Sequence, residues 1–134
     1  MNIFKAYKLL PFLILFSSAI YSSCNKATDT SRITVAGGSI TEIIYALGQE
    51  ENLIAVDITS NFPKQATELP SIGYVRALSA EGVLSLSPSL ILGENDMGPA
   101  AVMEQLSRVG IDIKIIPKKK KTVNKIFLII SLII

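Results

Sequence analysis

The chain has 134 residues, a formal net charge of +2 and 49% hydrophobic residues, with one Cys and no His. This length allows one modest domain, and the hydrophobic fraction excludes a disordered chain. The Cys and His counts exclude an internal disulfide framework, a His-based triad and a His-ligated zinc or haem within this chain, and the phosphate-binding motif GxxxxGK[ST] is absent.

The positive charge is confined to the two ends of the chain. Residues 1–24 carry two Lys and no acid, residues 118–134 carry five Lys and no acid, and residues 25–117 carry six basic and eleven acidic residues. The middle is therefore acidic overall and gives no electrostatic reason to expect nucleic-acid binding.

The N-terminal segment, residues 1–24, has the order of a secretory signal. Lys5 and Lys8 come first, an apolar run over 9–16 follows, and small residues lead to Cys24. The apolar run is too short to span a bilayer. We therefore expect the chain to be exported.

The end of this segment also resembles a bacterial lipoprotein signal, in which the Cys is acylated and becomes the first residue of the mature chain. The resemblance implies acylation of Cys24 and a periplasmic or cell-envelope location, with residues 25–31 as a short polar tether. Several acyl chains would anchor the chain stably in the membrane, whereas one would not. Tyr21 stands where the lipoprotein pattern has an aliphatic residue, which bears on how well the signal is processed. The alternative is an ordinary signal peptide with an incidental Cys.

The next segment alternates strand and helix patterns. A strand is predicted over 32–36, followed by two Gly and a capping box in which Ser39 and Glu42 begin a helix that stops at Gly48. A second strand is predicted over 53–56. The remaining elements, in chain order, are a Pro-containing loop over 61–70, a helix capped by Ser79 and running to about residue 86, a strand over 90–92, a helix from Pro99 to Val109, and a strand over 111–116. The order β-α-β-α-β-α-β predicts an α/β fold, a parallel sheet flanked by helices.

Ligands of such sheets bind at the carboxyl ends of the strands. At these ends lie residues 37–39, 57–61, 93–98 and the long loop up to Arg76. The Gly pair at 37–38 lacks the third Gly of a dinucleotide-binding motif. Asp57, Glu94 and Asp96 would form a metal cluster only if their loops converge, and are otherwise expected to be solvated loop acids.

The C-terminal segment, residues 118–134, differs in character from the rest. A run of four Lys over 118–121 precedes a nine-residue apolar run that is too short to span a membrane. A helix that is apolar all round needs a buried or membranous environment, and so small a domain offers no obvious place for it. We expect that the reading frame is lost near the lysine run, which would truncate the protein. The alternative is a genuine basic, apolar C-terminus that contacts a membrane.

Residues 32–117 resemble the first lobe of bacterial substrate-binding proteins of the haem, siderophore and cobalamin importers. The opening RITVAGGSITEIIYALG and the following ENLIAVDITSNFP match that lobe's first strand, turn, helix, second strand and loop. The segment PSIGYVRALSAEGVLSLSP at 70–88 is similar to the haem-binding branch, where a GY-x-R-x-LSAE-G stretch follows a Pro-containing loop. The resemblance implies the N-terminal α/β lobe of a two-lobed periplasmic binding protein, without its second lobe.

Three residues acquire expected roles from this resemblance. Tyr74 is expected to be an axial ligand of haem iron, Arg76 to support its phenolate, and Glu81 to pair with Arg on an ABC permease. A phenolate is a hard anionic donor suited to ferric iron, and a guanidinium nearby favours the anion through a charge-assisted hydrogen bond. On an extended loop, Tyr74 and Arg76 would point the same way.

The function that follows is haem binding for an ABC importer, with haem as the transported ligand and no chemical reaction. A site with one lobe would bury about half of the porphyrin and is expected to bind weakly. The first alternative keeps the importer and changes the ligand to a cobalamin or a ferric siderophore, with Tyr74 stacking on it. The second is a small exported nucleotide-dependent α/β enzyme, which the missing His and nucleotide-binding motifs disfavour.

Overall fold

A computed structural model describes residues 29–117 and 123–134 of the chain, and the side chains from Ile126 onwards in its last helix. The predicted signal, Cys24 and the lysine run at 118–121 lie outside these residues. The elements, in chain order, are β1 (Ile33–Ala36), α2 (Gly38–Ala46), the 3-10 helix η2 (Glu50–Asn52), β2 (Leu53–Val56), the 3-10 helix η3 (Lys64–Glu68), α3 (Ala80–Leu84), β3 (Leu90–Glu94), α4 (Ala100–Arg108), β4 (Asp112–Ile116) and α5 (Val123–Ile133).

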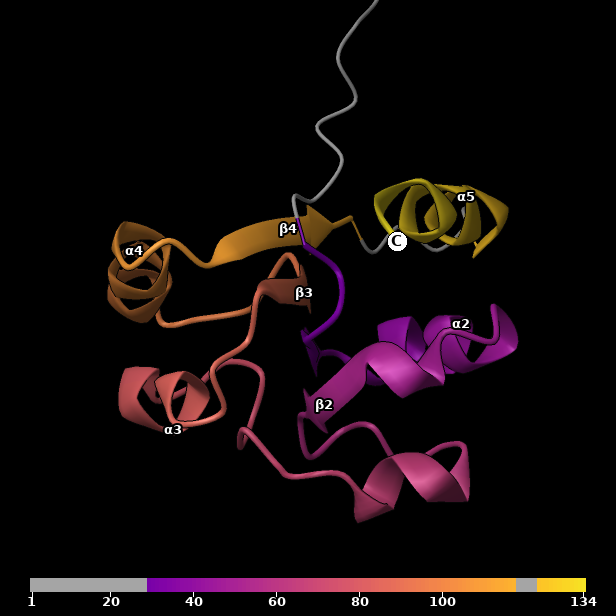
Figure 1. The fold of residues 1–134 in the computed structure, drawn as a ribbon, viewed down its shortest axis with the longest axis horizontal. Coiled ribbons are helices and arrows are strands. Elements are labelled where there is room, and N and C mark those ends of the chain that lie inside the picture. Colours follow the sequence, from indigo (N-terminus) through magenta and orange to yellow (C-terminus); the bar gives the residue numbers. More distant parts are fainter. Residues whose placement is uncertain (1–28, 118–122) are drawn as a thin grey trace, which may run out of the picture.

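The four strands form one parallel sheet in the order β2-β1-β3-β4. Figure 1 shows three layers, with α2 and α5 on one face of the sheet and α3 and α4 on the other. The predicted α/β fold, a parallel sheet flanked by helices, is therefore confirmed. Because all four strands run the same way, their carboxyl ends lie along one edge.

Two apolar clusters fill the spaces between these layers. Alternate residues of a strand point to opposite faces, so Leu90 and Leu92 of β3 pack under α2 and α5, while Ile91 packs under α3 and α4. All three side chains are fully buried. This explains why the strands read as continuous apolar runs, as expected when both faces of a parallel sheet are covered.

Most of the predicted helix boundaries agree with the structure to within a residue or two. Gly48 and Gly110 follow the last residues of α2 and α4 with φ of 66° and 91°, the left-handed conformation that ends helices. Ser79 caps α3 by accepting a hydrogen bond from the Gly82 N–H at 3.3 Å. That helix ends at Leu84, about two residues before the predicted end, and the chain then turns at Ser87, whose φ is 49°. The loop predicted over 61–70 contains η3.

The apolar C-terminal segment forms α5 and packs against α2. Its inward face is buried through Ile126, Ile130 and Ile133, which join the apolar cluster on that side of the sheet. The expectation that the domain offers no place for an apolar helix is therefore wrong. On the side of the sheet that carries α2, α5 packs beside α2 and against β4. Among the described residues, no helix has the length and hydropathy required to cross a membrane.

Candidate functional site

A buried polar network holds the carboxyl ends of β1 and β2 together. Asp57 follows β2 directly, is 2% exposed, and accepts a hydrogen bond from the Gly37 N–H at 3.1 Å. The same carboxylate accepts from the hydroxyls of Ser60 at 2.9 Å and Thr59 at 2.7 Å. Thr59 Oγ1 in turn accepts from the Gly38 N–H at 3.1 Å. Asp57 and Thr59 thus satisfy the first N–H groups of α2 from a neighbouring strand end.

The predicted capping box at the start of α2 is wrong. The helix begins at Gly38 and its N-cap is Gly37, two residues before the predicted cap Ser39. Ser39 donates its hydroxyl instead to Glu94 at the end of β3, at 2.6 Å. The charge-assisted bond that the Ser39 hydroxyl donates to the carboxylate is stronger than the neutral bond that its oxygen would accept from a backbone N–H in a capping box, and the tertiary contact therefore prevails over the local motif.

Asp57 and Glu94 serve this edge as hydrogen-bond acceptors. Both are buried, at 2% and 5% exposure, whereas they were expected to be solvated loop acids. Asp96 alone of the three acids is exposed. Within the described part of the chain, no group of three or more Cys, Asp or Glu side chains is placed to hold a metal ion. The edge is therefore braced by its acids through hydrogen bonds with hydroxyls and backbone N–H groups.

The loop that carries Tyr74 is fastened on both sides. On one side it follows β2, through hydrogen bonds from the Val56 N–H to Pro70 O and from the Ile58 N–H to Gly73 O, both at 3.0 Å. On the other it meets the loop after β3, through bonds from the Gly98 N–H to Val75 O and from the Leu78 N–H to Gly98 O, both at 2.9 Å. The loop is thus part of the sheet edge.

The side chains of this loop divide into two sets. Val75 and Leu78 are buried in the cluster beneath α3 and α4 and hold the loop down. Tyr74 is 42% exposed and Arg76 is also exposed. The buried residues therefore leave the phenol and the guanidinium accessible at the end of the sheet where ligands of such folds bind.

Tyr74 and Arg76 are on a turn, and the expectation of an extended loop is wrong. The Ala77 N–H donates to Tyr74 O at 2.8 Å, which closes a four-residue turn over 74–77. The Tyr74 side chain nevertheless influences the Arg76 guanidinium. The pKa of Arg76 lies above its usual value, first because Asp96 accepts its hydrogen bond, and then through the charges of Tyr74 and Asp96.

Asp96 is the residue of this site that sequence reasoning did not assign to it. Its Oδ2 accepts from Arg76 Nε at 2.7 Å and also contacts Arg76 Nη2. The two residues are 20 apart in the chain and come from the loops after β2 and β3. Nothing in the local sequence marks Asp96, because the pairing depends on two strands being neighbours of β1.

Glu81 lies in the first turn of α3, where its side chain is exposed and its charge suits the helix dipole. It is on the helix that follows the Tyr74 loop. The structure therefore brings Tyr74, Arg76 and Asp96 together and leaves Glu81 on the adjoining surface.

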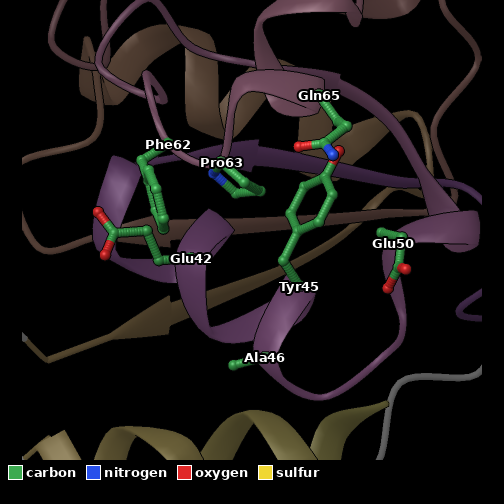
Figure 2. A pocket seen from close by; sticks show the side chains of 7 residues that line it. All are labelled: Glu42, Tyr45, Ala46, Glu50, Phe62, Pro63 and Gln65. Atoms are coloured by element: carbon green, nitrogen blue, oxygen red, sulfur yellow. The ribbon is translucent and has the colours of Figure 1, made fainter.

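A hollow of about 520 Å³ lies elsewhere, between α2 and the segment leading into η3. Figure 2 shows Tyr45 at its centre, with Phe62 and Pro63 on one side. Burial, followed by the charges of Glu50 and Glu68, raises the pKa of Tyr45. None of the predicted site residues lines this hollow, and it is separate from the Tyr74 loop.

Comparison with known proteins identifies the family. A model of the periplasmic binding protein family matches residues 33–125. The chain belongs to this family. The match includes the lysine run at 118–121. The resemblance recognised over residues 32–117 is thus confirmed at the level of the family.

Three periplasmic binding proteins illustrate the similarity. A vitamin B12-binding protein of Photorhabdus laumondii is 34% identical over 105 residues, which is 78% of this chain and 36% of that protein. A periplasmic haem-binding protein of Pseudomonas aeruginosa is 44% identical with a TM-score of 0.64, over 65% of this chain and 31% of that one. The periplasmic vitamin B12-binding protein of Vibrio cholerae is 31% identical with a TM-score of 0.58, over 64% and 34%. The chain thus spans about a third of the length of these relatives.

Proposed function

We propose that the chain is the haem-binding component of an ABC importer for haem iron, with Tyr74 as the iron ligand. The observation that carries this proposal is the accessible Tyr74 phenol beside Arg76, on a loop fastened to the carboxyl edge of the sheet. Of the three proteins compared above, the haem-binding protein is 44% identical and the two vitamin B12-binding proteins are 31% and 34% identical, which also supports haem.

The chemistry of these two side chains suits ferric haem. An anionic phenolate oxygen is a hard ligand for ferric iron, which favours loss of the phenol proton on binding. The positive charge of Arg76 stabilises the same anion and thereby favours the ligated state. The chain would supply binding and orientation, with no covalent change in the haem. This agrees with a family of substrate-binding transport components rather than enzymes.

A cobalamin or a ferric siderophore is the alternative cargo. The vitamin B12-binding relatives favour this reading, in which the Tyr74 ring would stack on the ligand. Competition of cyanocobalamin or a ferric siderophore against haemin distinguishes the two cargoes. A nucleotide-dependent enzyme, the remaining alternative, would require tight binding of NAD or ATP.

The test is a haemin titration of the purified chain followed by the Soret absorption. We expect the wild type to bind haemin with a spectrum typical of a phenolate ligand, and Tyr74→Phe to abolish that spectrum, because the variant keeps the ring and loses the oxygen. Tyr45→Phe is the matched control, since Tyr45 lines the separate hollow beside α2. An unchanged Soret band in Tyr74→Phe would remove the proposed ligand.

Export to the periplasm agrees with the family. We propose in addition that acylation of Cys24 anchors the chain to the membrane and that residues 25–31 form the tether. We also propose that the cargo is passed to an ABC permease, with Glu81 facing the permease. Glu81 is suited to this role because it is exposed at the start of α3, next to the Tyr74 loop.

A further inference from the structure

We propose that Asp96 is a positioning residue of the ligand site, which holds the Arg76 guanidinium where it can stabilise the Tyr74 phenolate. This inference rests on the proposed function and adds to it a residue from a different loop. It is carried by the contact between Arg76 and Asp96 and by the way the two loops are joined.

The contact uses one edge of the guanidinium. Asp96 Oδ2 accepts from Nε at 2.7 Å and contacts Nη2. The contact thus involves Nε and Nη2, on one edge of the guanidinium, while Nη1 lies on another edge. Because the guanidinium is planar and its donors are fixed in a fork, holding one edge also sets the direction of the other. Asp96 can therefore orient Arg76 without competing for every donor.

The ion pair between Arg76 and Asp96 is too exposed to contribute much to the folding stability of the chain. The side chains of Arg76 and Asp96 are 62% and 39% exposed. Exposed ion pairs contribute little to folding, because solvent screens the charges and ordering two side chains costs entropy. The loops are moreover already joined by the backbone hydrogen bonds of Gly98 with Val75 and Leu78. Asp96 is therefore not needed to join the two loops, and we assign to its contact with Arg76 the role of orienting the guanidinium.

The site needs such a device because Arg76 is otherwise weakly constrained. It lies on the turn over 74–77, between the buried residues Val75 and Leu78, and its own side chain is exposed. A long, mobile side chain loses much of its entropy when it orders on a ligand. An Arg76 that is already oriented avoids part of that loss at the moment of binding.

The experiment compares the wild type, Asp96→Ala and Asp96→Glu by the rate at which haemin is lost to a scavenging apo-globin. The phenolate-to-iron charge-transfer band serves as a spectroscopic readout. Loss of such an outer-shell partner is expected to raise the dissociation rate by roughly tenfold and to shift the band in Asp96→Ala. Asp96→Glu is expected to restore most of both. The matched control is Glu104→Ala, which removes the exposed ion pair of Glu104 with Arg108 on α4.

A double-mutant cycle decides whether Asp96 acts through Arg76. In an Arg76→Ala background, Asp96→Ala is expected to add nothing to the dissociation rate. An equal effect in both backgrounds overturns the proposal. An Asp96→Ala variant that holds haemin as long as the wild type also overturns it, because Asp96 would then have no effect on binding. A variant that holds haemin longer overturns it too, because the negative charge of Asp96 would then matter more than the orientation of Arg76.

Failure of the proposed function gives a different result. A wild type without a Tyr74-dependent haemin spectrum overturns the function, and with it the part of the inference that concerns the Tyr74 phenolate. The Arg76 Nε–H signal in NMR spectra of the ligand-free chain then shows whether Asp96 orders the guanidinium on its own. A signal equally sharp in the wild type and in Asp96→Ala would overturn the ordering role as well.

Discussion

At the scale of single residues, the carboxyl edge depends on two glycines that let α2 start very close to its neighbours. A Cβ on Gly37 would lie 2.6 Å from Glu94 Cγ, and a Cβ on Gly38 would lie 2.6 Å from the backbone oxygen of Thr59. These short approaches allow the Gly37 and Gly38 N–H groups to reach Asp57 and Thr59. The Gly pair therefore serves close packing of a helix on a strand end.

This close approach predicts the effect of adding one methyl group. Gly38→Ala is expected to lower the free energy of unfolding by about 1–3 kcal/mol, because the opposing atom belongs to the backbone and cannot simply rotate away. Gly82→Ala in α3 is the control: its Cβ would meet Ser79 Cβ at 3.6 Å, an ordinary contact. That change is expected to be neutral or to stabilise by up to about 1 kcal/mol. Urea unfolding followed by circular dichroism measures both, and equal stability of Gly38→Ala and wild type would contradict the argument.

At the scale of elements, α5 shows how a helix with no polar face packs on the domain with one side buried. Its buried residues recur every three or four positions, at Ile126, Ile130 and Ile133, and contact the cluster under α2. The outward residues Leu128 and Leu132 are 59% and 53% exposed. The helix thus has a packed side and an open side, although its composition is apolar on both.

The packing of α5 leads to a prediction that contrasts its two sides. Ile130→Ala is expected to cost about 2–5 kcal/mol of folding free energy, because Ile130 is fully buried and the change leaves a cavity. Leu132→Ala on the same helix is expected to change stability by less than about 0.5 kcal/mol, since its side chain is largely in solvent. Chemical denaturation of the two variants checks this. A similar cost for both would mean that α5 is not docked on α2 in solution.

At the scale of the whole molecule, parallel strand order determines which loops meet. Because β1 lies between β2 and β3, the loops after β2 and β3 are close enough for Arg76 to pair with Asp96. The chain spans about a third of the length of its relatives, and the family match continues through the lysine run to residue 125. Loss of the reading frame near that run remains a prediction, which resequencing across codons 118–121 would check.

The proposed docking to a permease would involve the outer surface of the molecule. Glu81→Lys is expected to weaken binding to membrane vesicles that contain the cognate ABC permease by about three- to tenfold, because an attractive charge pair becomes repulsive. Haemin binding should not change, since Glu81 is outside the group formed by Tyr74, Arg76 and Asp96. Glu104→Lys on α4 is the control for a general charge effect. Equal weakening by both variants would rule out a specific role for Glu81.

The sequence by itself determined the features that depend on neighbouring residues. Apolar runs and turn-forming Gly predicted the four strands, the ends of α2 and α4, and the Ser79 cap. The GYVRALSAEG stretch predicted the family, and the resemblance gave Tyr74, Arg76 and Glu81 their expected roles. These signals are local because strand propensity, helix capping and a short motif need only a few consecutive residues.

Only the tertiary structure decided the features that join distant segments. Ser39 donates to Glu94 instead of capping its own helix, Asp57 accepts from the Gly37 N–H at the start of α2, α5 packs on α2, and Asp96 pairs with Arg76. Each of these contacts joins residues about 20 or more apart in the chain. Their energy depends on burial and on which strands are neighbours, and neither quantity is set by local sequence.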